Sequence, residues 1–238
     1  MGVCKVRVRN NVVVEDNMAF RCAAACGHLS VVRELLEIES VKNSAAALNN
    51  WALRKAVLNG HLSVVQELLK IESVKKNAAA LNNMAFRCAA ERGYFQVVQE
   101  LLKIKFVKDN VMALGNDAFR RAAQNGHLSV VQELLKVRSV KDNVMALNND
   151  ALLWAVACGH LPVVQALLKI KSVKDSMVIE NNEALYLAAQ NGHLLVVQEL
   201  LKIKSVKDNL VALDNGVLRL AAFMGHFPVI KELLKYYE

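Results

Sequence analysis

The chain is short of the residues that mark disordered, membrane-spanning or exported proteins. Only 2 of its 238 residues are proline, and aromatic residues make up 5%. No apolar run approaches the roughly 18 residues of a membrane span, and the first residues, MGVCKVRVRN, lack the apolar centre of a secretory signal. With 54% hydrophobic and 22% charged residues, the composition is that of a globular protein.

Cysteine is also scarce, and its distribution is irregular. The 5 residues are Cys4, Cys22, Cys26, Cys88 and Cys158. A disulfide framework needs an even, patterned set, so we interpret these as reduced, buried small side chains and expect a cytoplasmic protein. Cys22 and Cys26 share a helix face, but their unit does not supply the four ligands of a zinc site. We expect no metal and no cofactor.

Motifs for catalysis are missing. The sequence contains no GxSxG, HExxH, CxxC or GxxxxGK pattern. All 6 histidines lie in similar turns, at His28, His61, His127, His160, His193 and His226. Because packed helix layers are about 8–10 Å apart while zinc holds nitrogen at about 2 Å, neighbouring turns cannot share a metal. We therefore expect these histidines to pack the turns, no catalytic residues, and no small-molecule substrate.

What the chain has in abundance is a repeat. Gly-His, once Gly-Tyr, returns every 33 residues, at Gly27, Gly60, Gly93, Gly126, Gly159, Gly192 and Gly225. The stretch QNGHLSVVQELLK at 124–136 reappears as QNGHLLVVQELLK at 190–202. A period this strict predicts one elongated array instead of one or two ordinary domains.

Each unit predicts a helix pair. In the unit 149–182, small and medium apolar residues recur at helical spacing at Ala151, Leu152, Ala155 and Val156. Asn149 is the expected N-cap of this first helix, and Gly159 its expected C-terminal stop. Pro162 falls in the first turn of the second helix, as Pro228 does in the last unit.

A third segment follows each pair. In SVKDNVMALNN at 139–149, Val140, Val144 and Leu147 again have helical spacing. Ser139 and Asp142 have the form of a capping box. We predict a short third helix of about two turns here, not a β-hairpin.

These features resemble the ankyrin repeat over essentially the whole chain, through EALYLAA at 183–189 followed by GHLLVVQELL at 192–201. The resemblance implies an all-α, ankyrin-like repeat solenoid of about seven 33-residue helix-turn-helix units, with a short third helix replacing the usual β-hairpin. We expect a single array over residues 1–238, with a partial N-terminal unit at 1–16 and seven helix pairs at 17–238. The usual Thr-Pro is absent, and the usual histidine is replaced by Arg21, Arg54, Arg87, Arg120 or Arg219. The variant also resembles repeats of effectors from intracellular bacteria, which implies a host cytoplasm.

A net charge of +8 raises a second function class. Basic residues recur in the third segments, at Lys103, Lys105 and Lys108, then Lys136, Arg138 and Lys141, then Lys169, Lys171 and Lys174, then Lys202, Lys204 and Lys207. Stacked, they would form a ladder able to bind nucleic acid or anionic lipid. The alternative, which we favour, is a solvated edge that interleaved acidic residues such as Glu133 and Asp142 partly neutralise.

The positions that vary between units lie on one stripe of the first helix. Solenoids bind through extended concave faces, and in the family that this chain resembles the first-helix surface carries partner contacts. The predicted partner-binding residues are Trp51, Lys55, Asn59, Arg92, Asp117, Arg121, Gln124, Asn125, Asp150, Trp154, Glu183, Tyr186 and Gln190. The alternative is neutral variation at exposed sites, with Trp154, Leu187 and Leu220 partly in the core.

We therefore expect a non-enzymatic scaffold that binds a protein partner. The last unit carries apolar Phe223, Met224 and Phe227, although terminal repeats normally need polar outer faces. These residues indicate that the terminal units pack on another chain or domain.

Overall fold

The computed structural model describes residues 14–176, 182–212 and 215–236. Within those ranges every regular element is a helix, which confirms the all-α prediction. Contacts group the chain into two compact units, unit 1 at residues 1–118 and unit 2 at residues 119–238. The two units are described separately.

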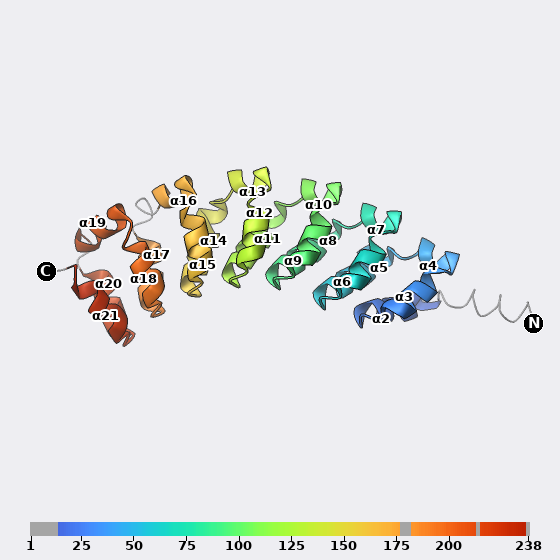
Figure 1. The fold of residues 1–238 in the computed structure, drawn as a ribbon, viewed down its shortest axis with the longest axis horizontal. Helices are drawn as coiled ribbons and strands as arrows, with labels where there is room; N and C mark the ends of the chain where they lie inside the picture. The colour runs from blue at the N-terminus through green and yellow to red at the C-terminus, as the bar shows by residue number, and fades with distance from the viewer. Residues whose placement is uncertain (1–13, 177–181, 213–214, 237–238) are drawn as a thin grey trace, which may run out of the picture. The chain divides into compact units, whose positions relative to one another are not determined.

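The helices fall into three sets that alternate along the chain (Figure 1). The first helices are α2 (Val14–Ala25), α5 (Ala47–Leu58), α8 (Ala80–Glu91), α11 (Ala113–Gln124), α14 (Ala146–Ala157), α17 (Glu183–Gln190) and α20 (Gly216–Phe223). The second helices are α3 (Leu29–Leu36), α6 (Leu62–Leu68), α9 (Phe95–Leu102), α12 (Leu128–Leu134), α15 (Leu161–Leu168), α18 (Leu194–Leu200) and α21 (Phe227–Leu234). The third helices are α4 (Glu39–Asn43), α7 (Glu72–Lys76), α10 (Lys105–Asp109), α13 (Arg138–Asp142), α16 (Lys171–Ser176) and α19 (Lys204–Ala212).

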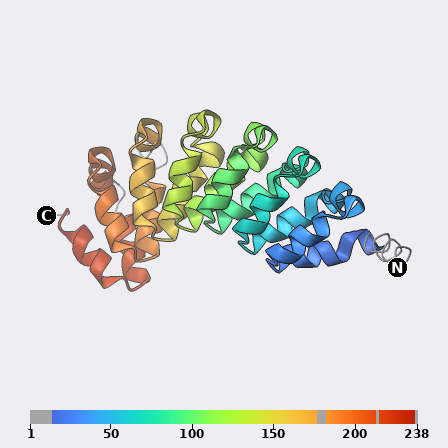
Figure 2. The same cartoon turned by 45° about the vertical axis from the view of Figure 1, so that its right-hand side comes forward.

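Each unit is built of two helical layers. In unit 1, α2, α5 and α8 pack side by side, and α3, α6 and α9 form the second layer (Figure 2). In unit 2, α14, α17 and α20 form the first layer, and α12, α15, α18 and α21 form the second. None of the described helices has the length and apolar character needed to cross a membrane.

The core lies between these layers, on the faces that the periodicity predicts. In α14, Ala151, Leu152, Ala155 and Val156 are buried, and in α15 so are Val163, Val164 and Leu167. Gly159 has φ +74° just after α14, the left-handed conformation that ends a helix most cheaply at glycine. Pro162 occupies the first turn of α15 as predicted.

The third helices are present, but the predicted capping box is wrong. Helix α13 has 5 residues, and its N-cap is the extended Val137 (φ −81°, ψ 118°), which makes no side-chain cap. Because the helix begins two residues earlier than the capping box predicts, Ser139 is already inside the first turn and cannot cap it. Asp142 pairs instead with Arg138, at 3.4 Å between Oδ2 and Nε.

Near their start, within the bounds given above, α5, α8, α11 and α14 each contain a left-handed turn of three residues, which separates the preceding third helix from the regular part of the first helix. Leu48, Asn49 and Asn50 all have positive φ, between 54° and 60°. A branched side chain such as Leu pays about 1–2 kcal/mol in this region, so the turn needs support. Arg54 supplies it, because its Nε donates to the Asn49 carbonyl oxygen (2.9 Å) and its Nη2 to the Leu48 carbonyl oxygen (3.1 Å).

The second asparagine of these turns does not cap its own helix with its side chain, so the prediction for Asn149 is wrong. Asn149 is buried, with φ +65°, and its Nδ2 donates to Ser176 Oγ (2.9 Å). Asn50 and Asn83 likewise donate to carbonyl oxygens of the third helix that follows, those of Val74 (2.7 Å) and Val107 (2.8 Å). The asparagine therefore ties a first helix to its own third helix.

The interpretation of the cysteines as buried is also wrong. Cys22, Cys26 and Cys158 are exposed, and Cys88 is half-buried. They occupy the variable positions of the first helices, whereas the buried face next to Cys22 is formed by Ala23 and Ala24. Cys4 lies outside the described residues.

Candidate functional site

The predicted partner-binding residues lie on the first helices, and we call them together the first-helix surface. In unit 1 its centre is Trp51, a half-buried side chain on α5. The Arg21 guanidinium carbon lies 5.2 Å from the centre of the Trp51 ring, and Lys55 Nζ lies 5.6 Å from it. Two cations over one indole fix its orientation through cation–π attraction.

Other unit 1 members of this surface differ in accessibility. Arg92, at the end of α8, and Asn59, at the end of α5, are exposed. Asn59 Nδ2 donates to the Ala25 carbonyl oxygen at 2.8 Å. Asp117 is only 5% exposed, and its Oδ2 accepts from Arg87 Nη1 at 2.8 Å. Most of the Asp117 carboxylate is therefore used inside the unit.

In unit 2 the same position contains a three-residue contact. Arg120 Nη1 donates to Asp150 Oδ2 at 3.0 Å, and the Arg120 guanidinium lies 5.4 Å from the centre of the Trp154 ring. The Arg120 side chain is 10% exposed. The arginine thus holds an acidic and an aromatic member of the surface in fixed positions.

The remaining unit 2 members are more accessible. Glu183, Gln190 and Asn125 are exposed, whereas Arg121, Gln124 and Tyr186 are half-buried. Asn125 Nδ2 donates to the Arg121 carbonyl oxygen at 3.0 Å. The hydroxyl of Tyr186 lies so close to Gly216 that a side chain there would collide with it.

Sequence reasoning missed the arginines that organise this surface. Each reaches the residue thirty positions later, so that Arg21 contacts Trp51, Arg54 contacts Met84 Sδ (3.5 Å), Arg87 contacts Asp117 and Arg120 contacts Asp150. The signal was the recurrence of arginine at the position of the usual histidine. Its partner could not be read from the sequence, because the spacing of thirty depends on how neighbouring helices stack.

The Gly-His turns are scaffold. His193 Nε2 donates to the Ala157 carbonyl oxygen at 2.8 Å, and a Cβ on Gly159 would lie 2.6 Å from the His193 ring. His61 meets Gly27 and Ala25 in the same way in unit 1. The predicted turn-packing role of the histidines is thus what the geometry shows.

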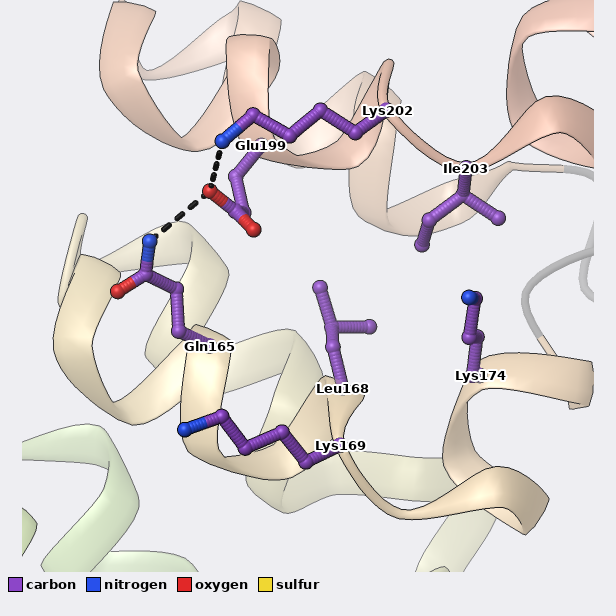
Figure 3. Close-up of a pocket in the computed structure, with 7 residues that line it drawn as sticks. All are labelled: Gln165, Leu168, Lys169, Lys174, Glu199, Lys202 and Ile203. Atoms are coloured by element: carbon purple, nitrogen blue, oxygen red, sulfur yellow. Dashed lines mark hydrogen bonds and ion pairs between the residues drawn. The ribbon is translucent and has the colours of Figure 1, made fainter.

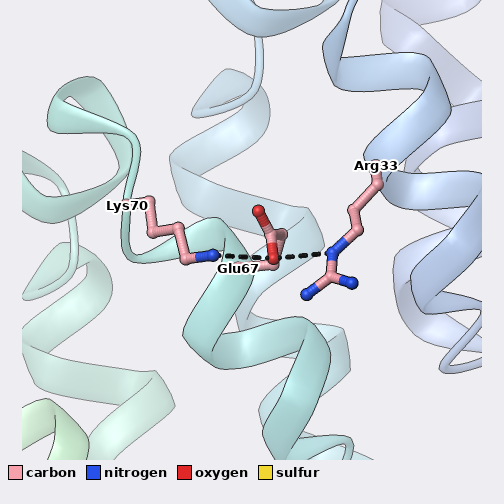
Figure 4. Close-up of polar contacts among 3 residues, drawn as sticks. All are labelled: Arg33, Glu67 and Lys70. Atoms are coloured by element: carbon pink, nitrogen blue, oxygen red, sulfur yellow. Dashed lines mark hydrogen bonds and ion pairs between the residues drawn. The ribbon is translucent and has the colours of Figure 1, made fainter.

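A line of glutamates connects neighbouring second helices, and we call Glu67, Glu100, Glu199 and Glu232 the carboxylate ladder. Glu67 Oε2 accepts from Lys70 Nζ (3.0 Å), just after the end of α6, and from Arg33 Nε (2.9 Å) on α3 (Figure 4). These hydrogen bonds, that of Lys70 first, hold the pKa of Glu67 below its ordinary value. Glu199 repeats the arrangement with Lys202 (2.8 Å) and Gln165 (2.9 Å).

Ladder and other carboxylates pair several of the basic residues proposed for electrostatic binding. Lys103 Nζ lies 2.9 Å from Glu100, Lys136 Nζ lies 2.7 Å from Glu133, and Arg138 pairs with Asp142. Paired surface lysines lose much of their field in water. The geometry thus favours the solvated-edge interpretation for these positions.

The chain was compared with models of known protein families. A family model described as ankyrin repeats (3 copies) matches residues 85–177 and 152–238. The chain belongs to the ankyrin-repeat family. A solved structure of an ankyrin repeat family protein from Legionella pneumophila is similar at 22% identity and a TM-score of 0.48, over 93% of this chain and 70% of that one. A comparison with curated proteins finds no match.

Ankyrin repeats are in general protein-interaction modules without catalytic activity, and this chain carries their architecture. In these repeats the first helices offer a surface on which arginines hold aromatic and acidic side chains in fixed positions. Among the described residues, no cluster of three or more His, Cys, Asp or Glu side chains has the geometry of a metal site.

Proposed function

We propose that this ankyrin-repeat protein is a non-enzymatic scaffold that binds a protein partner along the first-helix surface. The observation that carries the proposal is the pair of half-exposed tryptophans, each held by an arginine of the preceding repeat. Trp and Arg are the residues most often found as binding hot spots. A ring that is already oriented loses little conformational entropy when a partner covers it.

The accessible charged and amide residues support the same proposal. Arg92, Glu183 and Gln190 are exposed on the first helices of their units. Residues of this kind supply the polar rim that surrounds a central aromatic contact. Asp150 acts within the proposal by fixing Arg120 beside Trp154, whereas the buried Asp117 fixes Arg87, an arginine at the same position of another repeat.

The test replaces Trp51, Arg121 and Trp154 together by alanine and compares the proteins recovered by affinity capture. We expect the variant to lose partners that the wild-type chain retains. The matched control is Phe106→Ala, which removes a 53% exposed aromatic side chain from α10, outside the first-helix surface. Recovery of the same partners by the triple variant, with its helicity and unfolding midpoint preserved, would overturn the proposal.

The end of unit 2 supports a second contact with another chain or domain. Phe223 is 87% exposed and Phe227 is 71% exposed, which is unusual for residues of this size. We propose the cytoplasm as the compartment, on the reduced-cysteine interpretation of the sequence. A sedimentation experiment in which the chain stays monomeric at all concentrations would count against self-association through the exposed phenylalanines.

A further inference from the structure

A pocket of about 400 Å³ opens on the second and third helices of unit 2, away from the first-helix surface. Its lining is Gln165, Leu168, Lys169, Lys174, Glu199, Lys202 and Ile203 (Figure 3). Leu168 at the end of α15 and Ile203 after α18 face each other across the opening, and Lys174 on α16 rises beside them. We call this the unit 2 pocket.

The lysines of this pocket differ in their partners. Lys202 is paired with Glu199, three residues earlier on α18. Lys169 has Ala166 at that position, where the other described second helices from α6 onward have glutamate. Among the described residues, neither Lys169 nor Lys174 has an ion pair, so two cations of the lining lack a carboxylate.

Between these cations the otherwise polar lining has a small aliphatic part, formed by Leu168 and Ile203. Ile203 is 8% exposed and Leu168 is half-buried, and both present aliphatic side chains to the opening. A ligand that fits must therefore combine a carboxylate or other anion with an aliphatic group. Burying the aliphatic part removes apolar area from water, while the lysine stems can lie along it.

We propose that the unit 2 pocket binds an acidic segment of a partner protein, with an aliphatic side chain between Leu168 and Ile203, one acidic group beside Lys174 and a second carboxylate on Lys169, whose amine lies on the opposite side of the opening (Figure 3). The carboxylate takes the place of the glutamate that Ala166 has removed. In the carboxylate ladder each of these lysines has a glutamate three residues earlier, and its Nζ lies 2.8–3.0 Å from a carboxylate oxygen of that glutamate.

Charge and size favour a peptide over a nucleic acid or a lipid surface. Binding to a polyanion depends on many cations that contact successive phosphates, and this lining has two without an acidic partner. The aliphatic residues contribute little to the binding of a phosphodiester backbone, but they accommodate a leucine or valine side chain. The proposed occupant is thus a protein segment, on a surface separate from the one in the proposed function.

Unit 1 contains a matched pocket for comparison, of about 490 Å³ and lined in part by Leu69, Lys70, Glu72 and Ile104. Here Lys70 is paired with Glu67, and Glu72 stands at the position of Lys171 in unit 2. The unit 1 lining is more apolar, since it adds Phe106, and it also contains Lys75 and Lys105, but the carboxylates of Glu67 and Glu72 stand where unit 2 has Ala166 and Lys171. We expect an acidic segment to prefer the unit 2 pocket.

The test measures binding to the full chain of a short fluorescent peptide with leucines flanked by glutamates. Its counterpart has glutamine at each glutamate. We expect the acidic peptide to bind about tenfold more tightly than the glutamine peptide. Ala166→Glu should weaken the acidic peptide about fivefold by pairing Lys169 internally. The double variant K169A/K174A should weaken it about tenfold or more.

The matched control is Lys70→Ala in the unit 1 pocket, which should leave peptide affinity unchanged. Equal binding of the two peptides, or no effect of Ala166→Glu, would overturn the inference. So would tighter competition by a single-stranded oligonucleotide, or by phosphatidylserine-containing vesicles, than by the unlabelled peptide. Ala166→Glu restores the residue of the neighbouring repeats, so folding is preserved, and loss of partners in the first-helix triple variant leaves this measurement unaffected.

Discussion

The pockets of unit 1 and unit 2 have the same framework and different charge. Gln66, Leu69, Lys70 and Ile104 in the first correspond, three periods later, to Gln165, Leu168, Lys169 and Ile203 in the second. The charged positions around them differ, with Ala166 for Glu67, Lys171 for Glu72 and Asp175 for Lys76, and the unit 1 lining also has Phe106 where unit 2 has Ser205. The comparison shows that the repeat determines the shape of a pocket, while single exposed positions determine which of its cations are free to bind.

The largest predicted effect tests whether the framework is equivalent in the two units. Gly60→Ala and Gly159→Ala each put a Cβ at positive φ, against the Tyr94 ring (2.9 Å) and the His193 ring (2.6 Å) respectively. We expect each to destabilise its unit by about 2–3 kcal/mol, from backbone strain plus displacement of the ring. Urea unfolding can be followed in each unit separately, because the 2 tryptophans are Trp51 and Trp154.

The control is Gly225→Ala, at φ +75° with no atom within 4 Å of the added Cβ. It should cost only the backbone term, about 1 kcal/mol. If Gly159→Ala and Gly225→Ala were equally mild, the ring contact would not contribute to stability.

The second prediction transfers the property of one pocket to the other. The variant E67A/E72K removes from the unit 1 pocket the two carboxylates that have no counterpart in the unit 2 pocket. We expect the chain then to bind the acidic peptide at a second site, with the new site gaining about fivefold in affinity. Titration calorimetry measures the change in stoichiometry. One site in both proteins would show that the two pockets differ in something other than these residues.

A smaller effect is expected on stability. Ala166→Glu gives Lys169 a carboxylate three residues earlier. The new carboxylate stands at the repeat position of Glu199, which accepts a hydrogen bond from Gln165 of the preceding second helix. Exposed pairs of this kind contribute about 0.5 kcal/mol. The urea midpoint reported by Trp154 should rise slightly, and a fall would contradict the expected pairing.

The smallest predicted effect is on the acid limb of stability. The hydrogen bond from Lys202, then that from Gln165, lowers the pKa of Glu199, and Lys70 and Arg33 do the same for Glu67. A carboxyl with a lowered folded-state pKa stabilises the fold above its unfolded value, 4.5, and this contribution disappears as pH falls through the lower folded-state value.

The urea midpoint of each unit should therefore decrease between about pH 5 and about pH 3. Glu199→Gln should flatten this decrease in the Trp154 signal, because the amide does not titrate. An unchanged acid limb in that variant would mean that other carboxyl groups determine the acid sensitivity.

Much of the fold could be predicted because the same pattern of apolar residues and glycine recurs in seven units of the sequence. Period, glycine stops, the proline of the second helix and the buried faces were all confirmed from residues such as Gly159, Pro162 and Leu152. The third helix was predicted from the spacing of Val140, Val144 and Leu147, but α13 starts two residues before the predicted start and ends at Asp142, and Leu147 lies in the left-handed turn that follows.

What failed concerned contacts between segments distant in sequence. Asn149 resembles a helix cap locally, yet its side chain reaches Ser176, twenty-seven residues later. The cysteines looked buried because alanines surround them, but the helix turns them outward. The arginine contacts likewise depend on the stacking of neighbouring repeats, which a single repeat does not encode.

The most direct test of the central claim, that a protein partner binds the first-helix surface, is photo-crosslinking at two exposed positions of one repeat. A benzophenone amino acid replaces either Gln190 on α17 or Leu195 on α18, and the latter side chain is 63% exposed. The account predicts a protein adduct from position 190 and none of that partner from position 195. An adduct from position 195 with none from position 190 would contradict it.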